Sequence, residues 1–128
     1  MNKQIITLCI IFALLIVGTI TLLFYSQKEP RIENFDFSEY EWVIAQSPSD
    51  IVLGPIDNAT EAKKKALAIW IEIYGEKVNN KKPFIVSFDE QHGIWMVRGS
   101  LPPNYLGGVP YILIQKESGK VLAIWHGK

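Results

Sequence analysis

The chain has 128 residues, with 13 basic and 13 acidic side chains and a formal net charge of zero. This length is enough for one small domain with one core, and the balanced charge provides no global field that would attract nucleic acid. Cys9 is the only cysteine, so an intramolecular disulfide and a metal site built from several cysteines are both excluded.

An unbroken apolar run without a charged side chain occupies residues 5–25. About 20 apolar residues in a helix can cross the hydrocarbon core of a bilayer, where the helix satisfies its own backbone hydrogen bonds. The sequence therefore predicts one N-terminal transmembrane helix. We expect residues 1–27 to form a signal anchor, residues 28–50 a juxtamembrane acidic–aromatic segment, and residues 51–128 the soluble domain.

Three interpretations of the apolar run compete. A cleaved signal peptide would have a shorter apolar region followed by small residues at the cleavage site, and residues 23–27 offer no such site. A lipoprotein would carry its cysteine at the end of the run, whereas Cys9 stands near its beginning. We therefore favour an uncleaved signal anchor that crosses the membrane once.

The orientation of this anchor depends on the basic residues at its two ends. Lys3 precedes the apolar run, and Lys28 and Arg31 follow it, so the local count alone weakly favours the inverted orientation. An N-terminal anchor with a C-terminal domain nevertheless usually begins in the cytoplasm. We therefore expect the soluble domain to be extracytoplasmic.

Residues 33–57 contain acidic and aromatic side chains but no lysine or arginine. In one interpretation the aromatic rings pack on the main core and the acids face water. In the other, the segment forms an acidic, aromatic surface that meets a basic partner. The six acidic residues are Glu33, Asp36, Glu39, Glu41, Asp50 and Asp57.

The next segment has the clearest helical pattern of the domain. We predict a helix from about Thr60 to Tyr74, capped at its start by Asn58 or Thr60 and ended by Gly75. Lysines 63–65 are expected on its solvated face. Apolar residues at three- and four-residue spacing form the stripe expected to face the core: Ala62, Ala66, Leu67, Ile69, Trp70, Ile73 and Tyr74.

After residue 82 the apolar pattern alternates with a period of two. It predicts four strands near 83–89, 94–99, 109–116 and 120–126, and the short turns between several of them favour antiparallel pairing. One helix followed by such a meander indicates an α+β fold, with the helix on the concave face of a curved sheet. The residues expected to be largely buried are Ile69, Ile73, Phe84 or Ile85, Val97, Leu113 and Ile124.

The inventory of reactive groups is small. His92 in a hairpin turn and His126 near the C-terminus are both expected to be solvated polar residues. Asp89 and Glu90 are typical of a turn, no metal-ligand spacing is present, and residues 107–108 fit neither phosphate-binding glycine pattern. The sequence thus predicts no catalytic residue, no cofactor and no metal, and hence no enzyme.

Five segments stand in a characteristic order and spacing: residues 53–59 (LGPIDNA), 66–75, 95–102 (WMVRGSLP), 107–112 (GGVPYI) and 118–126 (SGKVLAIWH). In these segments the chain from Val52 to Lys128 resembles the NTF2-fold immunity proteins of bacteria, also called the YbbC/YhhH family. The resemblance implies an NTF2/cystatin-like cone of helix and curved sheet. It also implies an antidote that binds and blocks a polymorphic toxin and catalyses nothing.

The first functional hypothesis is therefore a membrane-tethered immunity protein with a cognate toxin as its partner. The alternatives are a small-molecule-binding domain that uses the cavity of the cone and an envelope adaptor domain. The sequence leaves the toxin and the oligomeric state open. Because interface energy concentrates in aromatic and arginine anchors, the candidate toxin contacts are the exposed members of one set: Tyr40, Trp42, Trp95, Arg98, Tyr105 and Trp125.

Overall fold

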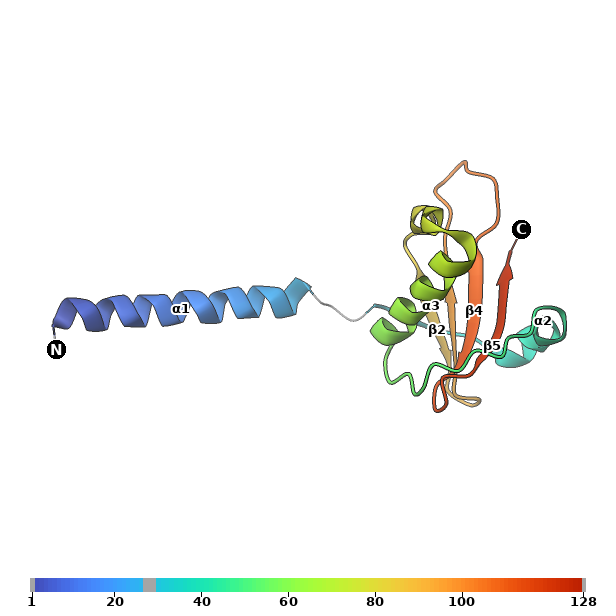
Figure 1. The fold of residues 1–128 in the computed structure, drawn as a ribbon, viewed down its shortest axis with the longest axis horizontal. Coiled ribbons are helices and arrows are strands. Elements are labelled where there is room, and N and C mark those ends of the chain that lie inside the picture. Colours follow the sequence, from blue (N-terminus) through green and yellow to red (C-terminus); the bar gives the residue numbers. More distant parts are fainter. Residues whose placement is uncertain (1, 27–29, 128) are drawn as a thin grey trace.

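A computed structural model describes residues 2–26 and 30–127, with only the helical backbone described for residues 17–26. A five-stranded sheet in the order β1-β2-β3-β4-β5 forms its centre. The elements, shown in Figure 1, are α1 (Lys3–Ser26), β1 (Ile32–Asn34), the 3₁₀-helix η1 (Phe37–Tyr40), α2 (Glu41–Gln46), α3 (Ala59–Tyr74), the 3₁₀-helix η2 (Glu76–Lys81), β2 (Ile85–Asp89), β3 (Ile94–Arg98), β4 (Pro110–Gln115) and β5 (Val121–His126).

Strands β2 to β5 form the antiparallel meander that the alternating pattern predicts. The prediction of four strands is wrong in one respect, because β1 adds a fifth strand. It pairs parallel to β2, with Ile32 opposite Val86, so the sheet is mixed. Strand β1 has three exposed residues, which is too short for a recognisable alternation, and its partner lies far away in the sequence.

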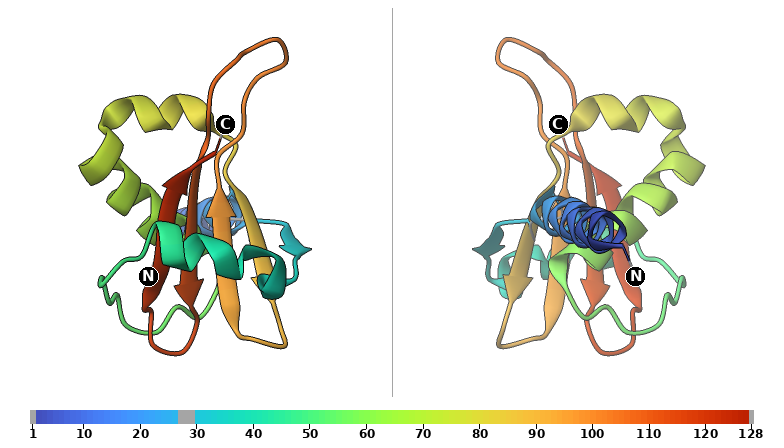
Figure 2. Two further views of the ribbon diagram at one scale, coloured as in Figure 1. Left: turned by 90° about the vertical axis from the view of Figure 1, so that its right-hand side faces the viewer. Right: turned by 90° about the vertical axis from the view of Figure 1, so that its left-hand side faces the viewer.

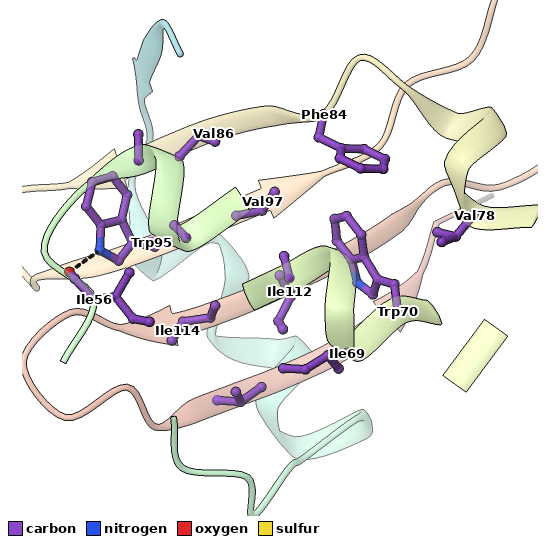
Figure 3. Packing of buried hydrophobic residues seen from close by; sticks show 14 residues of the cluster. Ile56, Ile69, Trp70, Val78, Phe84, Val86, Trp95, Val97, Ile112 and Ile114 are labelled. Carbon is purple, nitrogen blue, oxygen red and sulfur yellow. Dashed lines mark hydrogen bonds between the residues drawn. The ribbon is translucent and has the colours of Figure 1, made fainter. Parts of the chain in front are cut away.

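Helix α3 covers one face of the sheet and begins and ends as expected. The side-chain oxygen of Asn58 accepts a hydrogen bond from the backbone N–H of Glu61 at 2.8 Å, which caps the first turn. Gly75 ends the helix with a φ of 84°, a conformation that suits glycine. Figure 3 shows the 14-residue cluster between α3 and the sheet, including Ile69, Trp70, Val97 and Ile112.

One predicted core residue of α3 lies outside this cluster. Ile73 is 51% exposed, contrary to the predicted stripe, because Trp70 and Tyr74 are the stripe residues of the last turns that pack against the cluster. Ile69, Phe84 and Val97 are buried as predicted, and Ile124 is partly buried against the same cluster. The stripe therefore packs on the core along α3, and Ile73 lies at its exposed margin.

The other face of the sheet is covered by η1 and α2, which the sequence did not predict as a layer. Val43 of α2 is buried against Ile94, Met96, Leu113 and Ala123 of the strands. Leu113 is buried as predicted, but under α2, because neighbouring residues of a strand point to opposite faces. The predicted helix on one face is therefore found, and the sheet carries a second, unpredicted core on its other face, as Figures 1 and 2 show.

Residues 47–53 run along the edge of β5 and connect the two layers. The N–H of Val121 donates to the carbonyl of Ile51 at 2.8 Å, and the N–H of Leu53 donates to the carbonyl of Gly119 at 2.9 Å. Gly119 has a φ of 69°, and a Cβ added there would collide with the backbone of Gly54. Only glycine therefore fits this crossing of the β4–β5 turn and the connecting segment.

Helix α1 includes the whole predicted apolar helix and extends away from the sheet (Figure 1). The large apolar side chains described in it, from Ile5 to Ile16, are exposed. Judged on the described residues, no helix reaches the length and apolar content that a membrane crossing requires. The transmembrane helix is thus not confirmed, and the division at residues 27 and 50 stays a prediction.

Candidate functional site

A cleft of about 840 Å³ lies where the end of α3, η2, the 99–109 loop and the strands β4 and β5 meet. Arg98, Pro110 and His126 mark this open end of the sheet, and the two short β-turns mark its opposite, hairpin end. The cleft is lined by Tyr74, Lys77, Val78, Asn80, Lys81, Leu101, Pro102, Tyr105, Pro110 and His126.

The walls of the cleft are tied together by backbone hydrogen bonds. The N–H of Ser100 donates to the carbonyl of Lys81 at 2.7 Å, and the Ser100 hydroxyl donates to the carbonyl of Pro83 at 2.6 Å. The N–H of Gly99 donates to the carbonyl of Pro110 at 2.9 Å. The loop thus leaves β3 already fixed to η2 and to β4, which holds Lys81 at the wall of the cleft.

The described lining of the cleft contains basic side chains and no acidic one. Lys77, Lys81 and His126 line it, and within the described chain none of them forms an ion pair. Burial raises the pKa of Tyr74 above its ordinary value, and its hydroxyl can donate a hydrogen bond to a ligand. The His126 ring packs against the Tyr74 ring, with centroids 5.4 Å apart. This combination favours an anionic ligand.

Two of the six predicted contact residues are clearly exposed. Trp42 on α2 is 57% exposed, and Tyr105 on the 99–109 loop is 68% exposed and borders the cleft. Trp95, in contrast, is 3% exposed, and its indole N–H donates to the carbonyl of Ile56 at 3.0 Å. Trp95 is therefore a core residue in this structure and cannot contact a partner at the surface.

The other three predicted residues are partly buried and connect elements. The Trp125 ring stacks on Tyr111 at 5.0 Å and lies 6.3 Å from the Tyr40 ring, which holds η1 against β4 and β5. A guanidinium nitrogen of Arg98 lies 3.7 Å from a carboxylate oxygen of Glu33 and so links β3 with β1. Of the predicted set, only Trp42 and Tyr105 are thus clearly exposed, and they lie on different elements.

Glu39, Glu41 and Trp42 are exposed and form a surface that we call the acidic–aromatic patch. It lies on η1 and α2, where the Trp42 indole N–H donates to the carbonyl of Glu39 at 2.9 Å. The patch is on the face of the sheet opposite α3 (Figure 1). The patch corresponds to only part of the acidic, aromatic surface that the sequence suggests. Phe35, Phe37 and Tyr40 of the same segment pack against the core instead.

Asp36, Asp89 and His92 form a second polar cluster, at the hairpin end, with potential ligand atoms within 4.8 Å of one another. The buried Asp89 carboxylate accepts hydrogen bonds from the Phe37 N–H at 2.7 Å and from the His92 N–H and ring Nδ1 at 2.9 Å. Burial by itself raises the pKa of Asp89, but these hydrogen bonds and the neighbouring His92 outweigh it and lower the pKa below 3.8.

This cluster has a structural role. One Asp89 oxygen closes the β2–β3 turn, as the sequence predicts, and the other holds Phe37, which lies 52 residues earlier in the chain. The tie fixes the start of η1 to the sheet. The sequence does not predict this hydrogen bond, because no local pattern indicates a contact between residues so far apart in the chain. The cleft was missed for the same reason, since η2 and the loop approach each other only in the folded chain.

Comparison with known proteins places this geometry in context. A family model described as NTF2 fold immunity protein matches residues 62–128, which is slightly more than half of the chain. The match contains most of α3, the strands β2 to β5 and every residue that lines the cleft. The acidic–aromatic patch precedes it. No curated protein and no solved structure matches the chain significantly.

Proposed function

The chain belongs to the NTF2 fold immunity protein family, and from this premise we propose that it binds a cognate bacterial polymorphic toxin and neutralises it without catalysis. The family match over residues 62–128 is the observation that carries the proposal. Immunity proteins act on a toxin partner and are generally not catalytic. The ordered segments from Leu53 to His126 support the finer YbbC/YhhH-like assignment within the same proposal.

The positions of the histidines favour binding over catalysis. His92 lies in the β2–β3 turn at the hairpin end, where its ring faces Asp89. His126 lies at the open end, against Tyr74. Because a general acid and a general base must converge on one substrate, two histidines at opposite ends of the sheet do not form a catalytic pair. Protection would then reside in a contact surface.

The test is survival of cells that express the toxin encoded beside this gene, with and without the full chain. The proposal predicts that the chain restores growth and that the purified proteins form a complex in detergent. A mock plasmid and a noncognate toxin are the controls. Failure to bind any toxin from the neighbouring genes, together with failure to protect against them, would contradict the proposal.

The proposal includes a tether to the membrane through residues 5–25, with one crossing and an extracytoplasmic domain. The uncharged apolar run and the helical backbone of α1 support it. The test replaces Cys9 by serine and exposed Glu117 by cysteine, then treats intact cells with a membrane-impermeant maleimide. Labelling in intact cells and resistance to alkaline extraction are expected. Release by alkali, or labelling only after lysis, would contradict the tether or its orientation.

A second candidate function is supported by the volume of the cleft. About 840 Å³ lies within the range of 300–1,000 Å³ that is typical of small-molecule sites. Two of the predicted contact residues, Trp95 and Trp125, do not line the cleft, however. Native mass spectrometry separates the two functions: a co-purified small molecule with no toxin binding would favour the ligand-binding or adaptor alternative.

A further inference from the structure

We propose that the cleft at the open end is the docking site for an acidic segment of the partner protein. Lys77 and Lys81 would pair with its carboxylates, while Tyr105 and Leu106 cover its apolar flank. This inference rests on the proposed function only in taking that partner to be the toxin. It also assigns the toxin contact to the cleft and not to the acidic–aromatic patch.

The charges around the cleft define the chemistry of the occupant. The described lining contains two lysines and a histidine and no acidic residue. The nearest acid in η2, Glu76, is exposed, does not line the cleft and accepts a hydrogen bond from Asn79 Nδ2 at 3.1 Å. The ammonium groups are therefore not neutralised by their own element. An arriving carboxylate would find opposite charge without displacing an internal partner.

The rim of the cleft indicates a protein segment and not a free small anion. Leu106 is 99% exposed and Tyr105 is 68% exposed, on a loop that protrudes beyond the sheet (Figure 2). Exposed apolar and aromatic side chains beside a cleft are typical of contact surfaces. A small anion inside the cleft would leave both side chains in water, whereas an extended chain leaving the cleft would cover them.

The lower walls of the cleft are arranged before any partner arrives. Val78 is buried in the α3-side cluster, which anchors η2. The hydrogen bond from Ser100 to the Lys81 carbonyl fixes the base of the loop to the same element. A preorganised wall loses less conformational entropy on binding. The long lysine side chains and the loop tip can then adapt to the docked segment.

The first test uses the full chain in detergent and titrates it with a hexaglutamate peptide, followed by NMR. Chemical shift changes are expected at Lys77, Lys81 and Tyr105. The double variant K77E/K81E should weaken the affinity by about tenfold or more. The matched control K64E/K120E makes the same change of charge at exposed lysines away from the cleft and should leave the affinity within about twofold of wild type.

Three outcomes of this titration would overturn the inference. Shift changes centred on Lys63–Lys65, with none in the cleft, would show nonspecific attraction to lysine. Equal weakening by K64E/K120E would show the same. Binding of free citrate as tight as that of the peptide, with the same shift changes, would make the occupant a small anion.

The second test measures binding of the toxin to the same variants. K77E/K81E is expected to weaken toxin affinity by about tenfold or more and K64E/K120E by about twofold or less.

If wild type protects and K77E/K81E protects and binds equally well, this inference is wrong while the proposed function stands. If hexaglutamate binds the cleft but the wild-type chain neither binds nor protects against the toxin, the toxin assignment is wrong while the cleft's preference for acidic segments stands. Unchanged amide spectra in both variants show that they are folded.

Discussion

The two faces of the sheet are covered by layers that differ in how they are held. On one face the 16-residue helix α3 packs over a continuous apolar cluster that includes Ile69, Trp70 and Ile112. On the other face the short η1 and α2 bury only Val43 as a full core residue and are attached by specific polar and ring contacts. The larger apolar cluster therefore stabilises the first layer, while the smaller core of the second layer is supplemented by individual ties.

The two candidate contact surfaces belong to these two different layers. The cleft belongs to the α3 side, is cationic and lies wholly within the family match. The acidic–aromatic patch belongs to the η1–α2 side and lies outside that match. A function shared by a family is expected to reside in the shared part of the chain. This reasoning favours the cleft for toxin binding and leaves the patch as the covering of the second face.

The largest expected effect concerns the α3 layer. Ile69→Ala should reduce the free energy of unfolding by about 2–5 kcal/mol, because it removes a buried side chain and leaves a cavity. Ile73→Ala is the matched control, since it makes the same chemical change one turn later at an exposed position, and should cost less than about 0.5 kcal/mol. Denaturant unfolding measures both. Equal costs would show that α3 does not pack as described.

A smaller effect is expected for the tie that holds the second layer. Asp89→Ala should cost about 1–3 kcal/mol, because it leaves the N–H of Phe37 without its acceptor. Glu90→Ala, at the exposed neighbouring position, is the control. Hydrogen exchange should accelerate in residues 37–46 of the Asp89 variant while α3 remains protected. Uniform acceleration over both layers would contradict the separate attachment of η1 and α2.

The lowered pKa of Asp89 also predicts a dependence on pH. An acid whose pKa is lower in the folded than in the unfolded state stabilises the fold above the unfolded value of about 3.9. That contribution is lost as the pH falls through the lowered folded value. Unfolding measured between about pH 6 and pH 2 should show the loss in wild type and a smaller loss in Asp89→Asn. Identical pH profiles would contradict this role of Asp89.

The smallest effect is expected at the histidines. His92→Gln, at the hairpin end, should leave protection against the toxin essentially intact, and His126→Gln, which keeps a hydrogen-bonding side chain in the cleft, should reduce it only slightly. Removal of a general acid or base normally lowers a reaction rate by about 10²–10⁴-fold, whereas glutamine preserves much of the contact surface. Cell survival under toxin challenge, with expression checked, measures the effect. Loss of protection by a stably expressed variant that still binds the toxin would favour a catalytic mechanism.

The sequence predicts the parts of the fold that depend on local pattern. Helix α3 and the strands β2 to β5 are found close to their predicted bounds because apolar periodicity and turn residues specify them locally. Strand β1 and the η1–α2 layer were not predicted, since both depend on distant partners such as Val86 and Asp89. The periodicity of α3 likewise cannot show which residue at the margin of the stripe is exposed, and Ile73 is.

The candidate site was harder to predict for a related reason. Aromatic residues on strands and loops have the same sequence signature whether they are buried or exposed, so Trp95 and Tyr105 entered one set of candidates although only Tyr105 is at the surface. The lysines of η2 carry no motif. Their significance arises from the approach of the 99–109 loop, which the structure shows through the hydrogen bond between Ser100 and Lys81.

The most direct test of the central claim is a titration of toxin activity with the purified full chain. An immunity protein that acts by binding should inhibit the toxin at once. When the toxin concentration exceeds the Kd, the end point should lie at about one equivalent per toxin. The K77E/K81E variant should require a clear excess. Inhibition by about a hundredth of an equivalent that deepens with time would indicate turnover and would contradict neutralisation by binding.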